Sequence, residues 1–229
     1  MKRNKLKGVA IVEFSFAMLV MVPLLLGTTG IGLRLLQQMQ TIQLARDAAR
    51  MYARPGVDFS LPGNKTVLAT VGADLGLKTD GTGKAVLILT TVTYIDKGMC
   101  QSAGKSLDVN GNPINCPNYK NWVFAQRLVV GNTSIRTSNL GSPLTTGPSP
   151  VTVNATTGKI SISDQVNNPG DVANFTANPF VALDTNGAST GVLNTLPSGQ
   201  VLYITEAAAQ GFTMPPFANG GMMYAFNVF

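Results

Sequence analysis

The side chains that could carry out chemistry are few and scattered. The chain of 229 residues has no histidine and only two cysteines, Cys100 and Cys116. Ser-His-Asp and Cys-His nucleophile systems and His-ligated zinc are therefore excluded, and two cysteines cannot form a four-thiolate metal site. The carboxylates are isolated along the chain, so the sequence places no pair together for general acid–base work. We expect no catalytic site, no metal site and no cofactor, and hence no enzyme.

Two short motifs resemble ligand-binding loops only in part. Asp108-x-Asn110-x-Asn112 has the alternation of a calcium loop but lacks the following Gly and the distal Glu of that motif. Asp80–Lys84 resembles part of a phosphate loop, yet it precedes a predicted strand, whereas a Walker loop follows one. We interpret both motifs as turns.

The two cysteines lie in a turn-prone connection between two predicted strands. In an oxidising compartment, a disulfide between Cys100 and Cys116 would close the loop that separates them. Two free, buried cysteines are the alternative, and a redox-active pair is disfavoured because the two-residue spacing of that motif is missing. We predict the disulfide.

The net charge of +6 belongs to one end of the chain. Residues 1–54 hold eight basic and two acidic side chains, whereas residues 55–229 hold nine of each. A basic face that could bind nucleic acid is therefore not expected on the larger part of the protein.

An apolar segment follows the first basic residues. Residues 8–33 contain one ionisable side chain, Glu13, and about 20 apolar residues suffice to cross a bilayer. By the positive-inside rule, the preceding cations place the N-terminus in the cytoplasm and everything after the segment outside it. These topology-determining cations are Lys2, Arg3, Lys5 and Lys7. Pro23 should kink the helix within the membrane.

A cleaved secretory signal peptide and a plain uncleaved signal anchor are the two ordinary alternatives. A signal peptide has an apolar core of 7–15 residues and a small-x-small cleavage site. The apolar run here is longer, no Ala-x-Ala follows it, and Glu13 would be unusual in such a core.

Glu13 requires its own explanation, because a carboxylate within a membrane span is costly unless it is paired or neutralised. Snorkelling towards the cytoplasmic headgroups is the simplest account. A second account is a partner cation at the same depth. If the chain were cut after Gly8, the new α-amino group of Val9 would be such a cation, within one chain or between staggered neighbours.

These residues together resemble a known family. Basic residues, then Gly8, then an apolar run with Glu13 form the pattern of class III, type IV pilin-like signals cut by a prepilin peptidase. The stretch from Gly8 to Phe14, followed by Pro23-Leu-Leu-Leu-Gly27, is similar to TadE-like pseudopilins of tight-adherence (Tad/Flp) systems. The Ala48-Ala-Arg-x-x-Ala53 ending also resembles that family's long helix. The resemblance covers residues 1–54 and implies cleavage between Gly8 and Val9. Val9 departs from the Phe common at this place in major pilins.

After Arg34 the apolar pattern becomes amphipathic. Apolar residues recur at steps of three and four, with Gln, Arg and Asp at most other positions. We predict one helix over residues 9–54, ended by Arg54-Pro55-Gly56. Its apolar stripe should support the protein's own sheet, with contact to a partner helix as the alternative. The stripe comprises Leu35, Met39, Ile42, Ala45, Ala49 and Tyr52.

Residues 55–229 indicate a β-rich domain with many turns. Strands are predicted where β-branched and aromatic residues gather between Gly- and Pro-rich loops. They fall at residues 85–95, 122–131, 201–205 and 222–229, with a small hairpin over 151–153 and 159–162. Residues 65–75 are ambiguous and could form a short helix. Strands that follow one long helix favour an α+β fold with a mostly antiparallel, pilin-like sheet.

The sequence therefore predicts a basic leader (1–8), a long helix that spans the membrane in its first half (9–54), and an extracytoplasmic β domain (55–229). The resemblance implies a minor pilin or pseudopilin of the inner membrane, which could enter an extracellular pilus after assembly. Its implied partners are a prepilin peptidase, other pilin-like subunits, the inner-membrane assembly platform and membrane lipid. An uncleaved, signal-anchored binding module, such as a periplasmic or surface adhesin, is the alternative.

Overall fold

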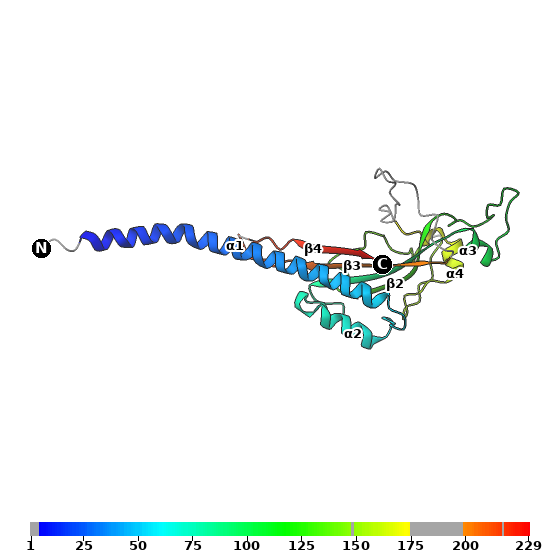
Figure 1. Ribbon diagram of the computed structural model, residues 1–229, viewed down its shortest axis with the longest axis horizontal. Coiled ribbons are helices and arrows are strands. Elements are labelled where there is room, and N and C mark those ends of the chain that lie inside the picture. The colour runs from blue at the N-terminus through cyan, green and yellow to red at the C-terminus, as the bar shows by residue number, and fades with distance from the viewer. Residues whose placement is uncertain (1–4, 148, 175–198, 217) are drawn as a thin grey trace, which may run out of the picture.

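The computed structural model describes residues 5–147, 149–174, 199–216 and 218–229, with side chains from Ile11 onward. Its first element is a single helix of 48 residues, α1 (Lys5–Tyr52). Figure 1 shows the N-terminal half of α1 projecting from the rest of the molecule, while its C-terminal half lies along the sheet. The helix ends just before Arg54-Pro55, where proline disfavours helical backbone in the preceding residue. It is continuous through Pro23, and the kink stays a prediction.

The strands form a four-stranded antiparallel sheet in the order β2-β1-β3-β4. The central pair is β1 (Ala85–Tyr94) and β3 (Val201–Gln210), flanked by β2 (Trp122–Gly131) and β4 (Met222–Val228). β1 is buried along almost its whole length, because both faces of the sheet are covered. The predicted α+β class, with one long apolar helix followed by an antiparallel sheet, is confirmed.

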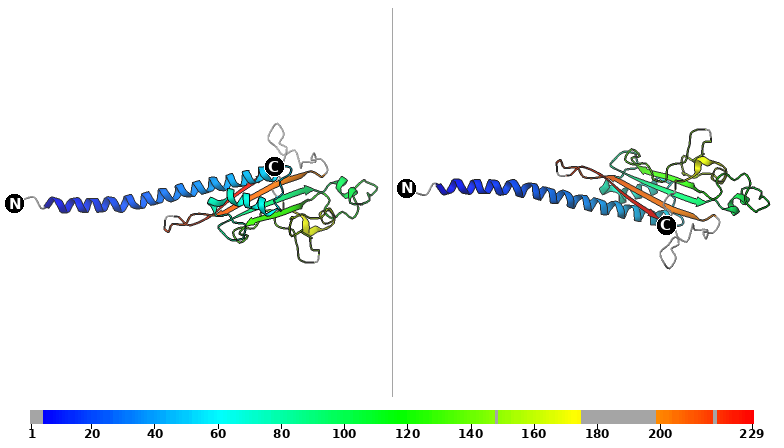
Figure 2. Two further views of the ribbon diagram at one scale, coloured as in Figure 1. Left: turned by 90° about the horizontal axis from the view of Figure 1, so that it is seen from below. Right: turned by 90° about the horizontal axis from the view of Figure 1, so that it is seen from above.

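The two faces of the sheet have different covers. On one face, Leu87 and Leu89 of β1 pack in a single cluster with Leu44 of α1 and Leu68 of α2 (Pro62–Val71). A 3-10 turn, η1 (Ala73–Leu75), adds Leu75 to the same cluster. Two views at right angles to Figure 1 show α1 on one side of the sheet and α4 (Ile162–Asn167) on the other (Figure 2). The second face is covered by the long connection after β2, which contributes residues such as Leu140, Val151 and Ile160.

Two predicted elements have different bounds in the structure. The predicted strand 201–205 continues to Gln210, through Glu206-Ala-Ala-Ala-Gln210, a stretch whose local propensity favours helix. Ala207 and Ala209 face α1 within the main core, where small side chains let the helix approach the sheet closely. The ambiguous residues 65–75 are helical, in α2 and η1.

The predicted small hairpin is wrong as a pair of strands. It is reduced to one bridge between Val153 and Ile160. Its second arm is diverted because Lys159 bridges Gln126 at the outer edge of β2. The chain then turns into α4, where the Ser161 side chain accepts a hydrogen bond from the backbone N–H of Asp164. A helix cap and an edge pairing thus replace the hairpin.

The predicted apolar stripe of α1 is correct only in its C-terminal half. Ala45, Ala49 and Tyr52 are buried, but Leu35 and Met39 are 61% and 62% exposed. They lie on the side of α1 that is turned away from the β3–β4 hairpin, which itself reaches Gln37. The buried face of α1 runs instead through Thr41, Leu44, Ala45, Ala48, Ala49 and Tyr52.

The N-terminal end of the contact between α1 and the sheet is polar. Gln37 Oε1 accepts a hydrogen bond from the backbone N–H of Phe212 at 2.7 Å. Gln38 Nε2 donates to the carbonyl oxygen of Tyr224 at 3.3 Å. Two glutamines that the amphipathic pattern assigned to the outer face therefore dock α1 on the connection between β3 and β4 and on the edge of β4.

The close approach of α1 to the sheet gives a testable expectation. Ala48 is completely buried, and Leu at this position would force the helix off the alanines of β3. We expect Ala48→Leu to lower the free energy of unfolding by about 2 kcal/mol, as overpacked cores usually do. Urea denaturation of the full-length protein in detergent micelles measures the change. Arg46→Leu, on the exposed side of the same turn, should change it by less than about 0.5 kcal/mol. Equal effects of the two variants would contradict the close-packing account.

Candidate functional site

Residues 5–9, which contain the end of the predicted leader and the predicted cleavage site, lie at the start of α1. Lys2 and Arg3 fall outside the described residues. Lys5, Lys7, Gly8 and Val9 lie in the first turns of the helix, where only the backbone is described. Cleavage between Gly8 and Val9 therefore stays a prediction.

Residues 11–33 of α1, called the rod below, form an exposed and mainly apolar stretch of helix. Its apolar side chains are uncovered by the rest of the chain, as Ile11, Phe14 and Leu19 illustrate. The most apolar 18-residue window of the helix has a mean hydropathy of 2.0, and none of it is buried within the protein. In length and composition the segment is compatible with a single-pass membrane anchor.

The hydroxyl side chains of the rod donate hydrogen bonds to carbonyl oxygens of the same helix. The hydroxyl of Ser15 donates to the carbonyl oxygen of Ile11 at 2.8 Å. Thr29 donates to the carbonyl oxygen of Leu25 at 2.8 Å, and Thr28 makes the same kind of bond one residue earlier in the helix. Hydrocarbon offers no other partner, so these bonds make the segment suitable for a lipid environment.

Glu13 is the exception within this rod. It is exposed, and the contacts of the described side chains provide no cation for it within the single chain.

The opposite end of α1 is fixed firmly in the β domain. The Tyr52 hydroxyl hydrogen-bonds to the Thr91 hydroxyl at 2.7 Å and donates to Gln126 Oε1 at 3.1 Å. Burial raises the pKa of Tyr52 far above its usual value, so the hydroxyl keeps its proton. Together with Gln37 and Gln38, these bonds hold α1 and the sheet as one unit.

Between the rod and this anchored end, part of α1 is apolar but uncovered. Leu35, Leu36 and Met39 are all more than half exposed. They belong to the stretch that the sequence assigned in part to the protein's own sheet. Their exposure favours the alternative prediction, in which this face contacts a partner helix.

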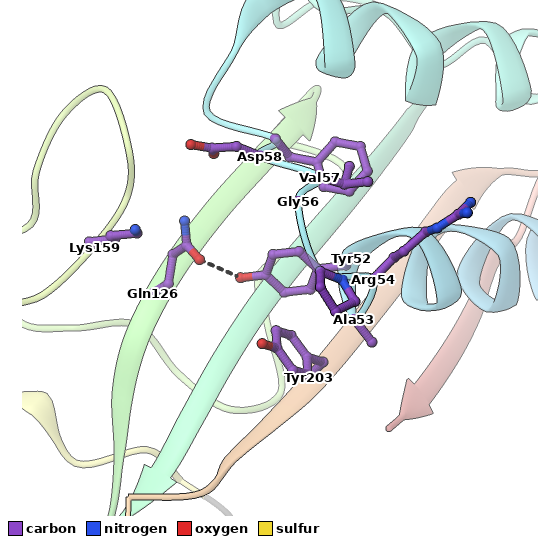
Figure 3. A pocket seen from close by; sticks show the side chains of 11 residues that line it. Tyr52, Ala53, Arg54, Gly56, Val57, Asp58, Gln126, Lys159 and Tyr203 are labelled. Atoms are coloured by element: carbon purple, nitrogen blue, oxygen red, sulfur yellow. Dashed lines mark hydrogen bonds between the residues drawn. The ribbon is translucent and has the colours of Figure 1, made fainter.

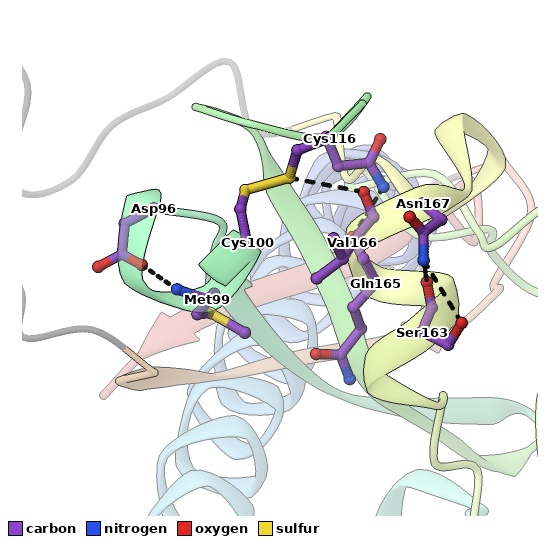
Figure 4. Close-up of a disulfide and its surroundings, with 9 residues drawn as sticks. Asp96, Met99, Cys100, Cys116, Ser163, Gln165, Val166 and Asn167 are labelled. Atoms are coloured by element: carbon purple, nitrogen blue, oxygen red, sulfur yellow. Dashed lines mark hydrogen bonds between the residues drawn. A yellow bond between two sulfur atoms is a disulfide. The ribbon is translucent and has the colours of Figure 1, made fainter. Parts of the chain in front are cut away.

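The disulfide is present and lies at the end of the sheet remote from the rod. Cys100 of α3 (Lys97–Ser102) is bonded to Cys116, and the pair packs with Ile95, Val123 and Val166. Figure 4 shows the bond joining α3 to the loop that passes beside α4. The Asp96 carboxylate caps α3 by accepting a hydrogen bond from the Met99 N–H at 2.8 Å.

Both ligand-like motifs are turns, as the sequence suggested. Asp108 Oδ1 accepts hydrogen bonds from the N–H groups of Asn112 at 2.7 Å and Asn110 at 2.9 Å, and these bonds lower the pKa of its carboxyl. Asp80 Oδ1 is bonded by the side chain and backbone of Thr82. Within the described part of the chain, no three His, Cys, Asp or Glu side chains gather as metal ligands would.

Two features were missed by sequence reasoning. The first is a cavity of about 360 Å³ beyond the end of α1, where Tyr52, Tyr203 and Gln126 form the interior and Asp58 and Lys159 lie across from each other (Figure 3). Its lining comes from α1, the following loop and the sheet, so no local pattern could reveal it.

The second is the buried carboxylate of Glu206, which accepts hydrogen bonds from the Asn139 N–H at 2.9 Å and the Tyr224 hydroxyl at 2.7 Å. Arg136 lies over the Tyr224 ring, 3.9 Å from its centre. These hydrogen bonds compensate for the burial of the Glu206 carboxylate and join the loop after β2 to the sheet. Glu206 lies just beyond the predicted strand 201–205, so the sequence pattern did not indicate its burial.

Comparison with known proteins finds similarity to one protein family, in a region that lies within α1. The family model described as TadE-like protein matches residues 8–50, which lie entirely within α1. No curated protein and no solved structure matches the chain. The resemblance predicted from the sequence is thereby confirmed for residues 8–50, over which this chain is similar to TadE-like proteins.

Proposed function

We propose that this protein is a minor pilin or pseudopilin of a Tad/Flp-type pilus or a related secretion filament, a structural subunit rather than an enzyme. The observation that carries the proposal is a TadE-like helix that projects from its domain with its apolar surface uncovered. A helix that is apolar all round needs lipid or other helices around it.

In this proposal the rod serves in two environments. Before assembly, α1 crosses the inner membrane once, with the basic leader in the cytoplasm and the β domain in the periplasm. A prepilin peptidase removes the leader after Gly8. The inner-membrane assembly platform then moves the subunit into a filament, where helices of neighbouring subunits replace the lipid.

Glu13 has a specific role in this scheme. The α-amino group of Val9 in one mature subunit pairs with the Glu13 carboxylate of the next, which sets the stagger between them. Incorrect registers leave an ionised carboxylate unpaired in hydrocarbon and are therefore penalised. The exposed residues Leu35, Leu36 and Met39 continue the helix contact outside the membrane.

The intact mass of the mature protein tests the cleavage. In cells that contain the prepilin peptidase, we expect the chain to lose Met1–Gly8, and Gly8→Arg to remain full length. Gly32→Ala is the matched control, since an added Cβ there meets nothing within 4 Å, and it should be cleaved normally. A full-length wild-type chain would contradict the pilin proposal and favour an uncleaved, membrane-anchored binding module.

The register role of Glu13 predicts a separate defect. Glu13→Ala should insert and be cleaved, because it makes the segment more apolar, yet its incorporation into filaments should fall at least tenfold. Sheared filaments and membranes, probed for the protein, measure the ratio. Ser15→Ala, whose hydroxyl bonds only within its own helix, should assemble normally. Normal incorporation of Glu13→Ala would refute the pairing.

A further inference from the structure

The β3–β4 hairpin extends beyond the sheet towards the N-terminal half of α1 (Figures 1 and 2). Its two arms remain paired past the ends of the strands. The N–H of Gly211 donates to the carbonyl oxygen of Gly221 at 2.9 Å, and Met214 and Ala218 exchange two bonds at 2.9 and 2.8 Å. Residues 211–216 and 218–222, called the hairpin tip below, therefore form the paired end of this hairpin.

The hairpin tip lies beside one face of α1 at a definable height. Its N-terminal arm is bonded to Gln37 through Phe212. On its C-terminal arm, Gly221 lies under the guanidinium of Arg34, which a Cβ at that position would approach to 2.6 Å. Further along the same face, Gly30 is buried, although Thr29 and Ile31 on either side of it in the sequence are exposed. Residues 30, 34 and 37 follow the spacing of one helix face.

This height coincides with the outer end of the apolar rod. Ile11–Leu33 comprises 23 residues, or about 34 Å of helix against about 30 Å of hydrocarbon. Arg34 is the first charged residue after Glu13 and so marks the level of the outer headgroups. The hairpin tip, which reaches from Gln37 past Arg34 towards Gly30, then lies at the boundary between headgroups and acyl chains.

The composition of the hairpin suits this level. After Glu206 the chain has no Asp, Glu, Lys or Arg up to residue 229. Phe212 is 36% exposed and Met222 46% exposed, and Pro215 and Pro216 are also exposed. The opposite end of the molecule, formed by α3 and the loop after it, instead carries Lys97, Lys105 and Asp108. Apolar and aromatic side chains without charge gain from an interfacial location, which charged loops avoid.

We propose that the hairpin tip is a second membrane contact, which inserts Phe212, Met222 and their neighbours into the outer headgroup–acyl boundary of a phospholipid bilayer. A single helix would let the domain swivel about its axis. A second contact on one side of α1 fixes which face of the domain is turned to the membrane. The proposal goes beyond the pilin function and rests only on its premise that α1 crosses the bilayer.

Quenching of a fluorophore on the full-length protein in phosphatidylcholine nanodiscs tests the proposal. The native disulfide occupies both cysteines, so Thr213→Cys, Asn110→Cys and Leu25→Cys can each be labelled singly without reductant. Thr213 is in the hairpin tip, Asn110 is in the exposed distal loop, and Leu25 is in the rod. We expect doxyl-labelled lipid to quench the Thr213→Cys label at least threefold more than the Asn110→Cys label, and aqueous iodide to show the reverse order.

The outcomes separate the proposal from its premise. Lipid quenching at Leu25→Cys with none at Thr213→Cys would overturn the hairpin contact and leave the anchor intact. No lipid quenching at Leu25→Cys would overturn both. A Thr213→Cys label shielded from lipid and iodide alike would mean that protein covers the tip, which also overturns the proposal. Adding Phe212→Asp to Thr213→Cys should reduce lipid quenching at least threefold with an unchanged circular dichroism spectrum.

Discussion

Raising the pH from 5 to 8 is expected to lower the free energy of unfolding of this protein, and Asp171→Asn should remove most of that decrease. Asp171 is completely buried in a 3-10 turn, η2 (Pro169–Asp171), and neither of its carboxylate oxygens has a hydrogen-bond partner among the described residues. Burial, assisted by the negative charge of Asp164, raises its pKa from 3.8 to about 8.

Proton linkage explains why the free energy of unfolding falls as the pH rises. Between pH 4 and 8 the folded protein holds a proton on Asp171 that the unfolded chain has lost, so the folded state binds more protons and stability falls as the pH rises. The slope is about 1.4 kcal/mol per pH unit, which gives a decrease of about 3–4 kcal/mol from pH 5 to 8. The stabilising state is fully present below pH 4 and is lost as the pH passes 8.

The composition of the chain leaves few other groups that could cause such a pH dependence of stability. The chain has no histidine and both cysteines are bonded, so no ordinary side chain titrates between pH 5 and 8. Urea denaturation of the full-length protein in micelles at several pH values gives the slope. Asp74→Asn, at an exposed carboxylate, should keep the wild-type slope. An Asp171→Asn variant that keeps it too would show that Asp171 is not the titrating group.

Removal of the disulfide should cost about 3 kcal/mol. The bond joins residues 16 apart, and the lost constraint on the unfolded chain has that magnitude for a loop of this length. The variant Cys100→Ser/Cys116→Ser should therefore unfold at lower urea concentration, and α3 should detach first, since the pair anchors it to Val123 and Val166.

Reduction provides the matched control for this prediction. A reductant should lower the stability of the wild type to that of the double variant and leave the variant itself unchanged. Alkylation of the denatured, unreduced wild type should add no mass, because no thiol is free. Addition of two alkyl groups, or equal stability with and without reductant, would show that the disulfide does not form.

Some elements were predictable because their signals are local. The length of α1 follows from a run of apolar residues, a periodic continuation and a proline stop, all read within a few turns. The strands β1 and β2 have the bounds predicted for them, within a residue, because β-branched residues gather between turn signals. In β3, by contrast, Glu206-Ala-Ala-Ala-Gln210 has helical propensity, and the pairing with β1 on one side and β4 on the other overrides it.

The buried face of α1 shows why local signals are not sufficient. Leu35, Met39, Ala45 and Tyr52 belong to one periodic stripe, but only the last two meet the sheet. Which side chains are covered depends on the side of the helix against which the β3–β4 hairpin lies. Gln37 and Gln38 are buried in part for the same reason, since the hairpin supplies backbone groups for their amides.

The sequence by itself determined the membrane-compatible helix, its similarity to TadE-like proteins and the α+β class, because hydropathy and residue spacing are properties of neighbouring residues. Only the tertiary structure decided that the Asp171 carboxylate is buried without a hydrogen-bond partner among the described residues, and that Leu35 and Met39 remain exposed. It alone brought the uncharged hairpin tip, through Gly221, beside Arg34. These outcomes depend on contacts between residues up to 187 positions apart (Arg34 and Gly221), and such contacts are fixed by the packing of whole elements rather than by any local pattern.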